Sequence, residues 1–191
     1  MVFRVCIKAL FPLFCFLIGQ GFLHAQDPLD LAFKWGYAPI ENVFLWGSVE
    51  PFPGESFEVS SPGMFGIALN IDRKKWLASE FSFDISPLKT IYDNSNSIQI
   101  RHRYIYSFMH TWRFIYINKP KSRLYSGVGV GFAVGYESGG YNLERSYLIQ
   151  TIPLGFSFGR KVYGFCETAL GMKCLGLCLG IGYRFENEKP R

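Results

Sequence analysis

Eight charged residues are the side chains of this sequence best placed to do chemistry together. All stand on the less apolar side of segments in which apolar and polar residues alternate: Lys34, Glu80, Asp84, Arg101, Arg103, Arg113, Glu167 and Arg184. If these sides of the segments face the narrow interior of one fold, such groups form a paired ionic network, because an unpaired buried charge is costly. The alternative is an ion path lined by arginine. We favour the network, and expect Asp84 to meet Arg101 and Arg103 across the interior.

An enzyme would need a nucleophile, a base and a group that orients the base. Beyond residue 25 the chain holds two histidines, His102 and His110, and both fall on the apolar side of their segment. Neither Ser107 nor Glu80 converges with them. We therefore predict no catalytic residues and no enzymatic activity.

Cysteine usage and net charge limit the possible ligands. Beyond residue 25 the cysteines are Cys166, Cys174 and Cys178, an odd number that rules out a complete disulfide framework. Cys174 and Cys178 lie about 13 Å apart on one extended strand, too far to bridge. No histidine or further cysteine completes a metal site, and "GVGVG" lacks the strand-to-helix context of a phosphate loop. We expect no metal, no cofactor and no nucleic acid partner.

The first 25 residues have the pattern of a cleaved signal peptide. Arg4 and Lys8 precede an apolar stretch over residues 9–19, and "LHA" supplies a small-residue cleavage site. The stretch is shorter than the roughly 20 residues that span a bilayer; an uncleaved anchor is the alternative. Removal of Arg4 and Lys8 lowers the net charge from +5 to +3.

Period-two alternation dominates the rest of the chain, as in "CLGLCLGIGYRF". Eight segments show it: 29–39, 64–71, 76–86, 98–116, 124–136, 148–158, 162–172 and 174–185. The second, fourth and sixth links are the short segments "DRK", "NKPKS" and "GRK", whereas most others are longer. Short turns at one end and long loops at the other predict an all-β fold, an eight-stranded antiparallel up-and-down transmembrane β-barrel over residues 26–185.

The composition of the two strand faces predicts which one points outward. An eight-stranded barrel has an interior that side chains just fill. In a bilayer its outer face must be apolar, with aromatic residues near the strand ends. We therefore expect lipid to contact Leu177, Phe132 and Phe156, while small and charged residues fill the middle. A barrel folded in water would reverse this arrangement.

The signal peptide, "LYSGVGVGFAVGY", "IPLGFSFGRKVYGFCETALG" and "LGIGYRF" together resemble the small eight-stranded outer-membrane β-barrel family, with an OmpA- or OmpX-like architecture. The resemblance implies the outer membrane of a Gram-negative cell, periplasmic termini and a short periplasmic tail, 186–191. It implies outer-membrane lipids, lipopolysaccharide and the assembly machinery as partners. Such barrels often end on the terminal aromatic, whereas here six residues follow Phe185.

The expected role is structural or surface-interacting. A narrow porin-like channel is the alternative, and a lipid-modifying outer-membrane enzyme ranks third. The first long loop, 40–62, contains Phe44, Leu45, Trp46, Phe52 and Phe57. Such a loop would fold over the barrel mouth, dip into the membrane interface or bind a surface partner.

Overall fold

The computed structural model describes residues 29–37, 56–94, 97–137 and 144–185. The predicted signal peptide and the tail 186–191 lie outside these ranges, as does most of the loop 40–62, so those predictions stay predictions.

The described residues form nine strands: β1 Leu29–Gly36, β2 Ser56–Ser60, β3 Met64–Lys74, β4 Leu77–Asn94, β5 Ser97–Lys119, β6 Ser122–Glu137, β7 Glu144–Gly159, β8 Val162–Gly171 and β9 Gly176–Phe185. Eight of them match the eight predicted segments. β2 was not predicted as a strand.

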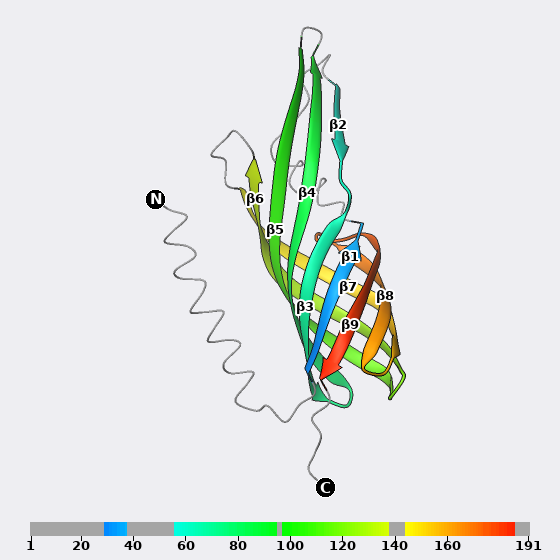
Figure 1. The fold of residues 1–191 in the computed structure, drawn as a ribbon. Coiled ribbons are helices and arrows are strands. Elements are labelled where there is room, and N and C mark those ends of the chain that lie inside the picture. Colours follow the sequence, from blue (N-terminus) through cyan, green and yellow to red (C-terminus); the bar gives the residue numbers. More distant parts are fainter. Residues whose placement is uncertain (1–28, 38–55, 95–96, 138–143, 186–191) are drawn as a thin grey trace.

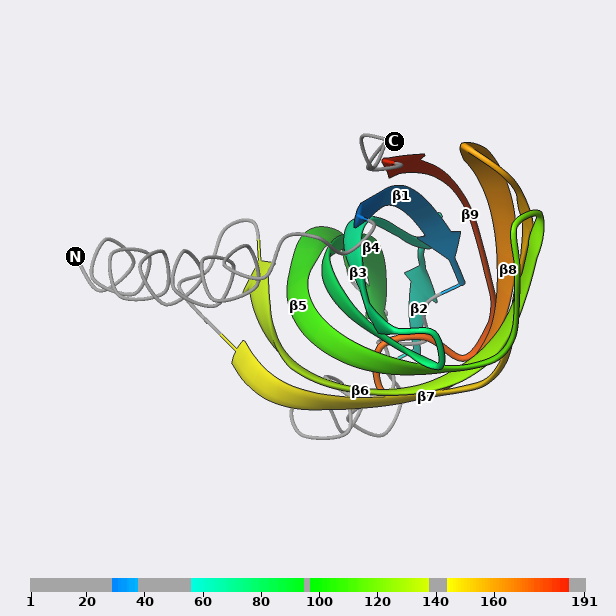
Figure 2. The same ribbon diagram turned by 90° about the horizontal axis from the view of Figure 1, so that it is seen from below.

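The eight long strands close into a barrel. Each pairs antiparallel with the next, and β9 pairs with β1 from Leu29↔Phe185 to Gly36↔Cys178. Viewed along the barrel, the strands form a ring (Figure 2). The prediction of an all-β, eight-stranded antiparallel barrel with up-and-down neighbours is confirmed.

The two ends of the barrel differ. Short turns at Lys75–Trp76, Pro120–Lys121 and Arg160–Lys161 lie at the end where β1 starts and β9 stops, which we call the turn end (Figure 1). The opposite, loop end carries the β4–β5 hairpin and the connection of residues 172–175 between β8 and β9. The predicted segregation of the three short turns is therefore present.

A three-stranded arm extends from the loop end (Figure 1). We define it as β2 with residues 88–94 of β4 and 97–102 of β5. Pairing between β5 and β6 stops at Arg103↔Glu137, whereas β4 and β5 stay paired to Asn94↔Ser97, and β2 joins β4 from Ser60↔Lys89 to Ser56↔Asp93. The expectation of a loop over 88–97 was wrong, because the β-branched and aromatic residues of "TIY" favour a strand, and turn residues occupy only "DNSN".

The outer face of the barrel is apolar, whereas its interior holds charged and small side chains together with some large apolar ones. Leu177 is 55% exposed and Phe156 is 45% exposed, while Gly129 is buried. Glu80 and Asp84 of β4 are fully enclosed. The outward faces predicted for the strands are present except in part of β7 and at Ile71 of β3, which was expected outside and is buried.

In β7 a bulge reverses part of the predicted pattern. Leu148 and Ile152, expected outside, are 1% and 4% exposed. The pairing with β8 shifts register between Thr151 and Gly155, so the alternation of inward and outward side chains does not continue unbroken along β7. The Thr168 hydroxyl donates to the Leu154 carbonyl at 3.0 Å and accepts from the Leu154 amide at 3.1 Å, which satisfies the disturbed backbone.

Glycines of the inner face make room for aromatic rings from neighbouring strands. A Cβ added at Gly180 would collide with the ring of Phe165, and one at Gly182 with the ring of Tyr163. Both rings are nearly fully buried. The glycine face of β9 therefore holds the aromatic face of β8, and the expectation of a wholly small or ionic interior was wrong.

Candidate functional site

Four charged side chains from four strands meet in the interior and form the central cluster: Lys34 from β1, Glu80 from β4, Arg113 from β5 and Glu167 from β8. The Lys34 ammonium donates to Glu80, and the Arg113 guanidinium forms ion pairs with both Glu80 and Glu167. Lys34 Nζ also lies 4.0 Å from Glu167 Oε2. The cluster carries two positive and two negative charges, so its formal charges cancel.

Tyr125 completes this cluster. Its hydroxyl donates to Glu167 Oε1 at 2.7 Å, and its ring lies 4.7 Å from the Arg113 guanidinium carbon. The ring occupies the space over Gly155 of β7, where a Cβ would collide with it. A hydrogen bond and a cation–π contact thus add to the ion pairs, which offsets part of the cost of burying these charges.

A second ionic group fills the interior near the turn end. Arg184 Nε lies 3.3 Å from Asp30 Oδ1, and Arg123 donates to both oxygens of Asp72 at 3.1 Å and 2.6 Å. Arg123 also lies 3.6 Å from Asp30, and Arg184 sits 5.1 Å from the Tyr163 ring centre. The strand termini at this end are thereby joined through side chains as well as through the backbone.

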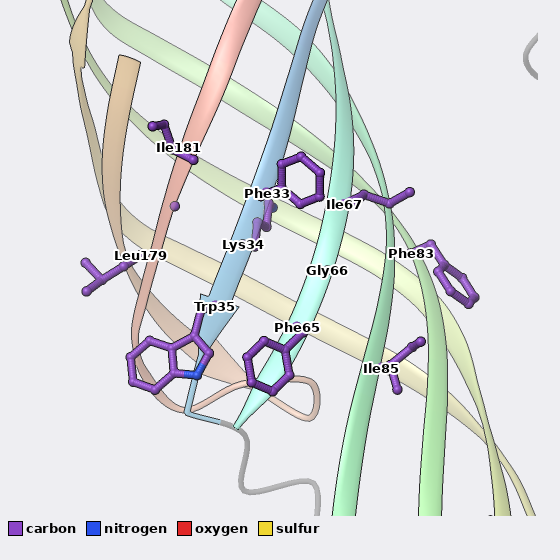
Figure 3. A pocket seen from close by; sticks show the side chains of 11 residues that line it. Phe33, Lys34, Trp35, Phe65, Gly66, Ile67, Phe83, Ile85, Leu179 and Ile181 are labelled. Atoms are coloured by element: carbon purple, nitrogen blue, oxygen red, sulfur yellow. The ribbon is translucent and has the colours of Figure 1, made fainter. Parts of the chain in front are cut away.

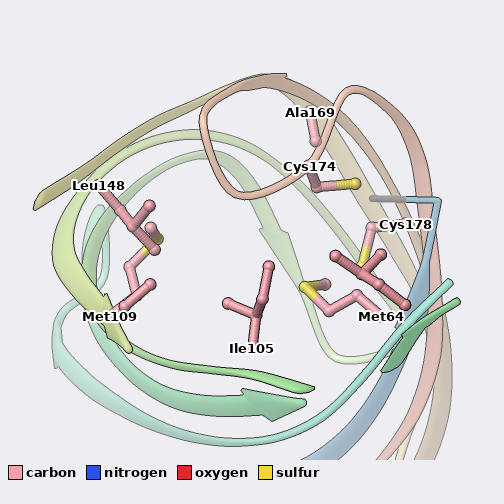
Figure 4. Packing of buried hydrophobic residues seen from close by; sticks show 9 residues of the cluster. Met64, Ile105, Met109, Leu148, Ala169, Cys174 and Cys178 are labelled. Carbon is pink, nitrogen blue, oxygen red and sulfur yellow. The ribbon is translucent and has the colours of Figure 1, made fainter. Parts of the chain in front are cut away.

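The loop end of the interior is closed by the connection between β8 and β9, which folds into the barrel mouth (Figure 4). Lys173 is 5% exposed, and its ammonium lies 2.6 Å from Asp84 Oδ2 and donates to Ser82 Oγ at 2.8 Å. The backbone amide of Cys174 donates to Gln150 Oε1 at 3.0 Å, and Gln150 Nε2 donates to the Cys174 carbonyl at 3.1 Å.

Beside this connection lies an apolar cluster of Met64, Leu88, Ile105, Met109, Ala133, Leu148, Ala169, Cys174 and Cys178. The Cys174 thiol donates to the Tyr37 carbonyl at 2.7 Å. Burial raises the pKa of this thiol to about 11, so it stays protonated at neutral pH. We call the connection together with this cluster the plug, because it occupies the barrel mouth.

The structure does not bring all the predicted site residues together. Lys34, Glu80, Arg113 and Glu167 share one cluster, Arg184 belongs to the turn-end group and Asp84 belongs to the plug. Arg101 and Arg103 lie opposite Thr90 and Leu88, whereas Asp84 lies opposite Ser107. The expected meeting of Asp84 with the two arginines was wrong, because β4 continues past Asp84 for ten more residues, to Asn94.

Four interior charges were missed by sequence reasoning: Asp30, Asp72, Arg123 and Lys173. Asp30 lies on the same face of β1 as Lys34, so the alternation in the sequence already indicated that it points inward. Asp72 and Arg123 lie just beyond the predicted strand limits, in strands that prove longer. Lys173 lies in a connection, where no periodicity indicates direction.

Both histidines lie outside the interior, as predicted from the apolar face of the strand on which they fall. His102 is exposed, and His110 stacks on Phe81 with ring centres 4.5 Å apart and meets Trp112 edge-on at 4.5 Å. In this setting His110 packs as an aromatic group on the outer wall.

The outer wall over β9, β1, β3 and β4 forms a shallow apolar depression (Figure 3). The side chains that project along it are Phe33, Trp35, Phe65, Ile67, Phe83, Ile85, Leu179 and Ile181. At its loop-end margin the Trp35 indole donates to the Pro62 carbonyl at 3.1 Å. The wall therefore presents a continuous apolar surface with its indole N–H directed to the margin.

Comparison with known proteins gives no family. No protein-family model matches the chain, and no curated protein matches it significantly. Within the described ranges, no group of three or more histidine, cysteine or acidic side chains is arranged to hold a metal ion. Nor does any helix there have the length and apolar character needed to cross a bilayer.

Proposed function

We propose that this chain is an integral outer-membrane β-barrel protein with periplasmic termini and a non-enzymatic, structural or surface-interaction role. The observation that supports it is the reversal of polarity across the barrel wall. Val130 and Leu179 are 45% and 44% exposed, whereas Glu80 and Asp84 are 1% and 0% exposed. Lipid around the wall accounts for both halves of this pattern.

A water-surrounded barrel would face two costs at once. It would expose an apolar belt around its whole circumference, far beyond the patch size normal for a soluble monomer. It would also enclose many ionised side chains while leaving large apolar groups in water. Aromatic residues near the strand ends, among them Trp76, Tyr136 and Tyr183, fit the interfacial level of a membrane barrel.

The arm favours a surface-interaction role over transport. The central cluster and the plug occupy the interior, which supports a closed barrel rather than a channel. The arm, by contrast, continues the sheet beyond the barrel, and among the described strands β2 and β5 are its edges there. Edge strands offer unpaired backbone groups to another chain. The outside partner of the arm would thus be a protein that binds at a strand edge.

Heat modifiability tests the membrane barrel. The unboiled protein in detergent should migrate differently from the boiled protein on a gel, because a closed barrel resists dodecyl sulfate until it is heated. Cell fractionation should place it with the outer membrane. A chain that remains in the soluble fraction and shows no shift would refute the proposal.

Epitope tags test the orientation. A tag inserted between Asn94 and Ser97, at the tip of the β4–β5 hairpin, should be detected by antibody on intact cells. A tag after Arg191 should be detected only when the outer membrane is permeabilised. The opposite result would mean that the arm points into the periplasm.

A further inference from the structure

The turn end carries a rim of cations from all three short turns. Six of these side chains are exposed: Lys74, Lys75, Lys119, Lys121, Arg160 and Lys161. Asp72, the acidic residue nearest to Lys74 and Lys75 in the sequence, is bonded to Arg123 in the interior. The rim, defined as these six residues, therefore concentrates positive charge at one level of the barrel.

The backbone of each turn is fixed to its neighbour. The Lys75 carbonyl accepts from Asn118 Nδ2 at 2.9 Å. The Lys121 carbonyl accepts from the Gly159 amide at 2.9 Å, and the Lys161 carbonyl accepts from the Arg184 amide at 2.7 Å. The main chain of one lysine in each turn is thus held in place while its side chain remains exposed, so the turn backbone that carries the rim is prearranged.

Aromatic residues of the outer wall lie within three positions of a rim cation. Trp76, Tyr116 and Phe158 are 52%, 66% and 63% exposed, and Lys74 Nζ lies 5.5 Å from the Trp76 ring centre. Aromatic side chains mark the level of the headgroups on a membrane barrel. Cations next to them stand at the depth of lipid phosphates.

We propose that the rim binds the headgroups of anionic glycerophospholipids, such as phosphatidylglycerol or cardiolipin, in the leaflet that meets the turn end. This inference rests on the proposed membrane location. A phosphodiester in that leaflet lies beside the barrel, at the depth of the aromatic side chains, where lysine ammonium groups and the Arg160 guanidinium reach it laterally. Binding of a soluble acidic polymer to the rim would not depend on the adjoining aromatic residues.

Cardiolipin titration of the full-length mature protein, observed by native mass spectrometry in detergent, tests the site. Replacing all six rim cations by glutamine should weaken cardiolipin binding by at least about a hundredfold, since each cation near a lipid surface contributes roughly a fivefold factor and about three of them suffice for that loss. Lys75→Gln alone should weaken it several-fold. Lys89→Gln, an exposed lysine of β4 at the loop end, is the charge-matched control and should leave binding unchanged. Added salt should weaken binding by the wild type.

Each other outcome would overturn the inference. One is a six-residue variant that binds cardiolipin as tightly as the wild type, and a second is a wild type that binds phosphatidylcholine as tightly as cardiolipin. A third is displacement of cardiolipin by excess inorganic phosphate, which would indicate a free-phosphate site. Another is a rim variant that loses binding only to a soluble acidic polymer.

A heat-dependent gel shift of each variant would show that it is folded. A wild-type protein that inserts into phosphatidylcholine vesicles without preferring cardiolipin refutes the lipid site alone. A wild-type protein that does not insert at all refutes the membrane barrel.

Discussion

The outer wall and the interior of this barrel are built from alternate residues of the same strands, yet they follow different rules. On the wall, large apolar side chains such as Val130 and Leu179 are exposed one beside another. In the interior, Lys34, Glu80 and Arg113 depend on one another across three strands. The wall is a set of nearly independent contacts with its surroundings, whereas the interior is a coupled network.

This difference predicts different responses to substitution. Wall positions should respond according to their depth along the barrel, because the solvent they meet changes with depth. Interior positions should respond according to the partners they leave behind, because a charge without its partner stays buried.

The largest effect is expected in the central cluster. Arg113→Met leaves Glu80 and Glu167 with Lys34 as their remaining cation there, and should lower the free energy of unfolding by about 3–5 kcal/mol. Urea unfolding in lipid vesicles, followed by tryptophan fluorescence, measures it. Lys89→Met, which replaces an exposed cation of the arm, should change stability by less than about 0.5 kcal/mol. Equal effects of the two substitutions would show that the interior is not coupled.

A charge placed on the wall should have a smaller, depth-dependent effect. Val130→Arg, near the middle of β6, should cost about 2–4 kcal/mol in a bilayer, and Ile117→Arg, close to the turn end, about 0–1 kcal/mol. The same unfolding assay compares them. If both were neutral, the wall would face water and the contrast between wall and interior would disappear.

The smallest of the three effects concerns glycine and aromatic packing. A Cβ at Gly182 would press on the Tyr163 ring, so Gly182→Ala should cost about 1–3 kcal/mol. At Gly164, on the opposite face, the nearest atom is the Gly180 carbonyl oxygen at 3.9 Å, and Gly164→Ala should be close to neutral. Adding Tyr163→Leu should recover part of the loss at Gly182. A Gly182→Ala variant as stable as the wild type would contradict the packing described.

Sequence alternation predicted the barrel, its turn end and the inward parity of most charged residues. Period two depends only on local backbone geometry, so positions such as Glu80 and Arg113 can be assigned without knowing their neighbours. The bulge in β7 could not be assigned this way, because one extra residue reverses the parity of Leu148 and Ile152. Two parts of the arm were missed, because "LKTIYDN" in β4 has no regular alternation and β2 is only five residues long and follows the turn residues "PFPG".

Which charges meet could not be predicted. Strands in a barrel are staggered relative to one another, so positions at equal heights in a flat diagram lie apart in space. Asp84 was assigned to Arg101 and Arg103 for a different reason, because β4 was expected to end near Asp84 and instead continues to Asn94. Its ion pair is with Lys173, from a connection that has no periodicity. Alternation along one strand predicts whether a side chain points inward or outward. Its partner depends on the stagger between strands and on connections that fold inward.

The seam between β1 and β9 has a consequence for how the chain reaches its native state. Leu29 pairs with Phe185, a separation of 185 − 29 = 156 residues, so the ring cannot close until the final strand has been synthesised. Contacts this distant in sequence are slow to form. Until then β1 and β8 each keep an open edge that can pair with another chain, so a product lacking β9 should aggregate.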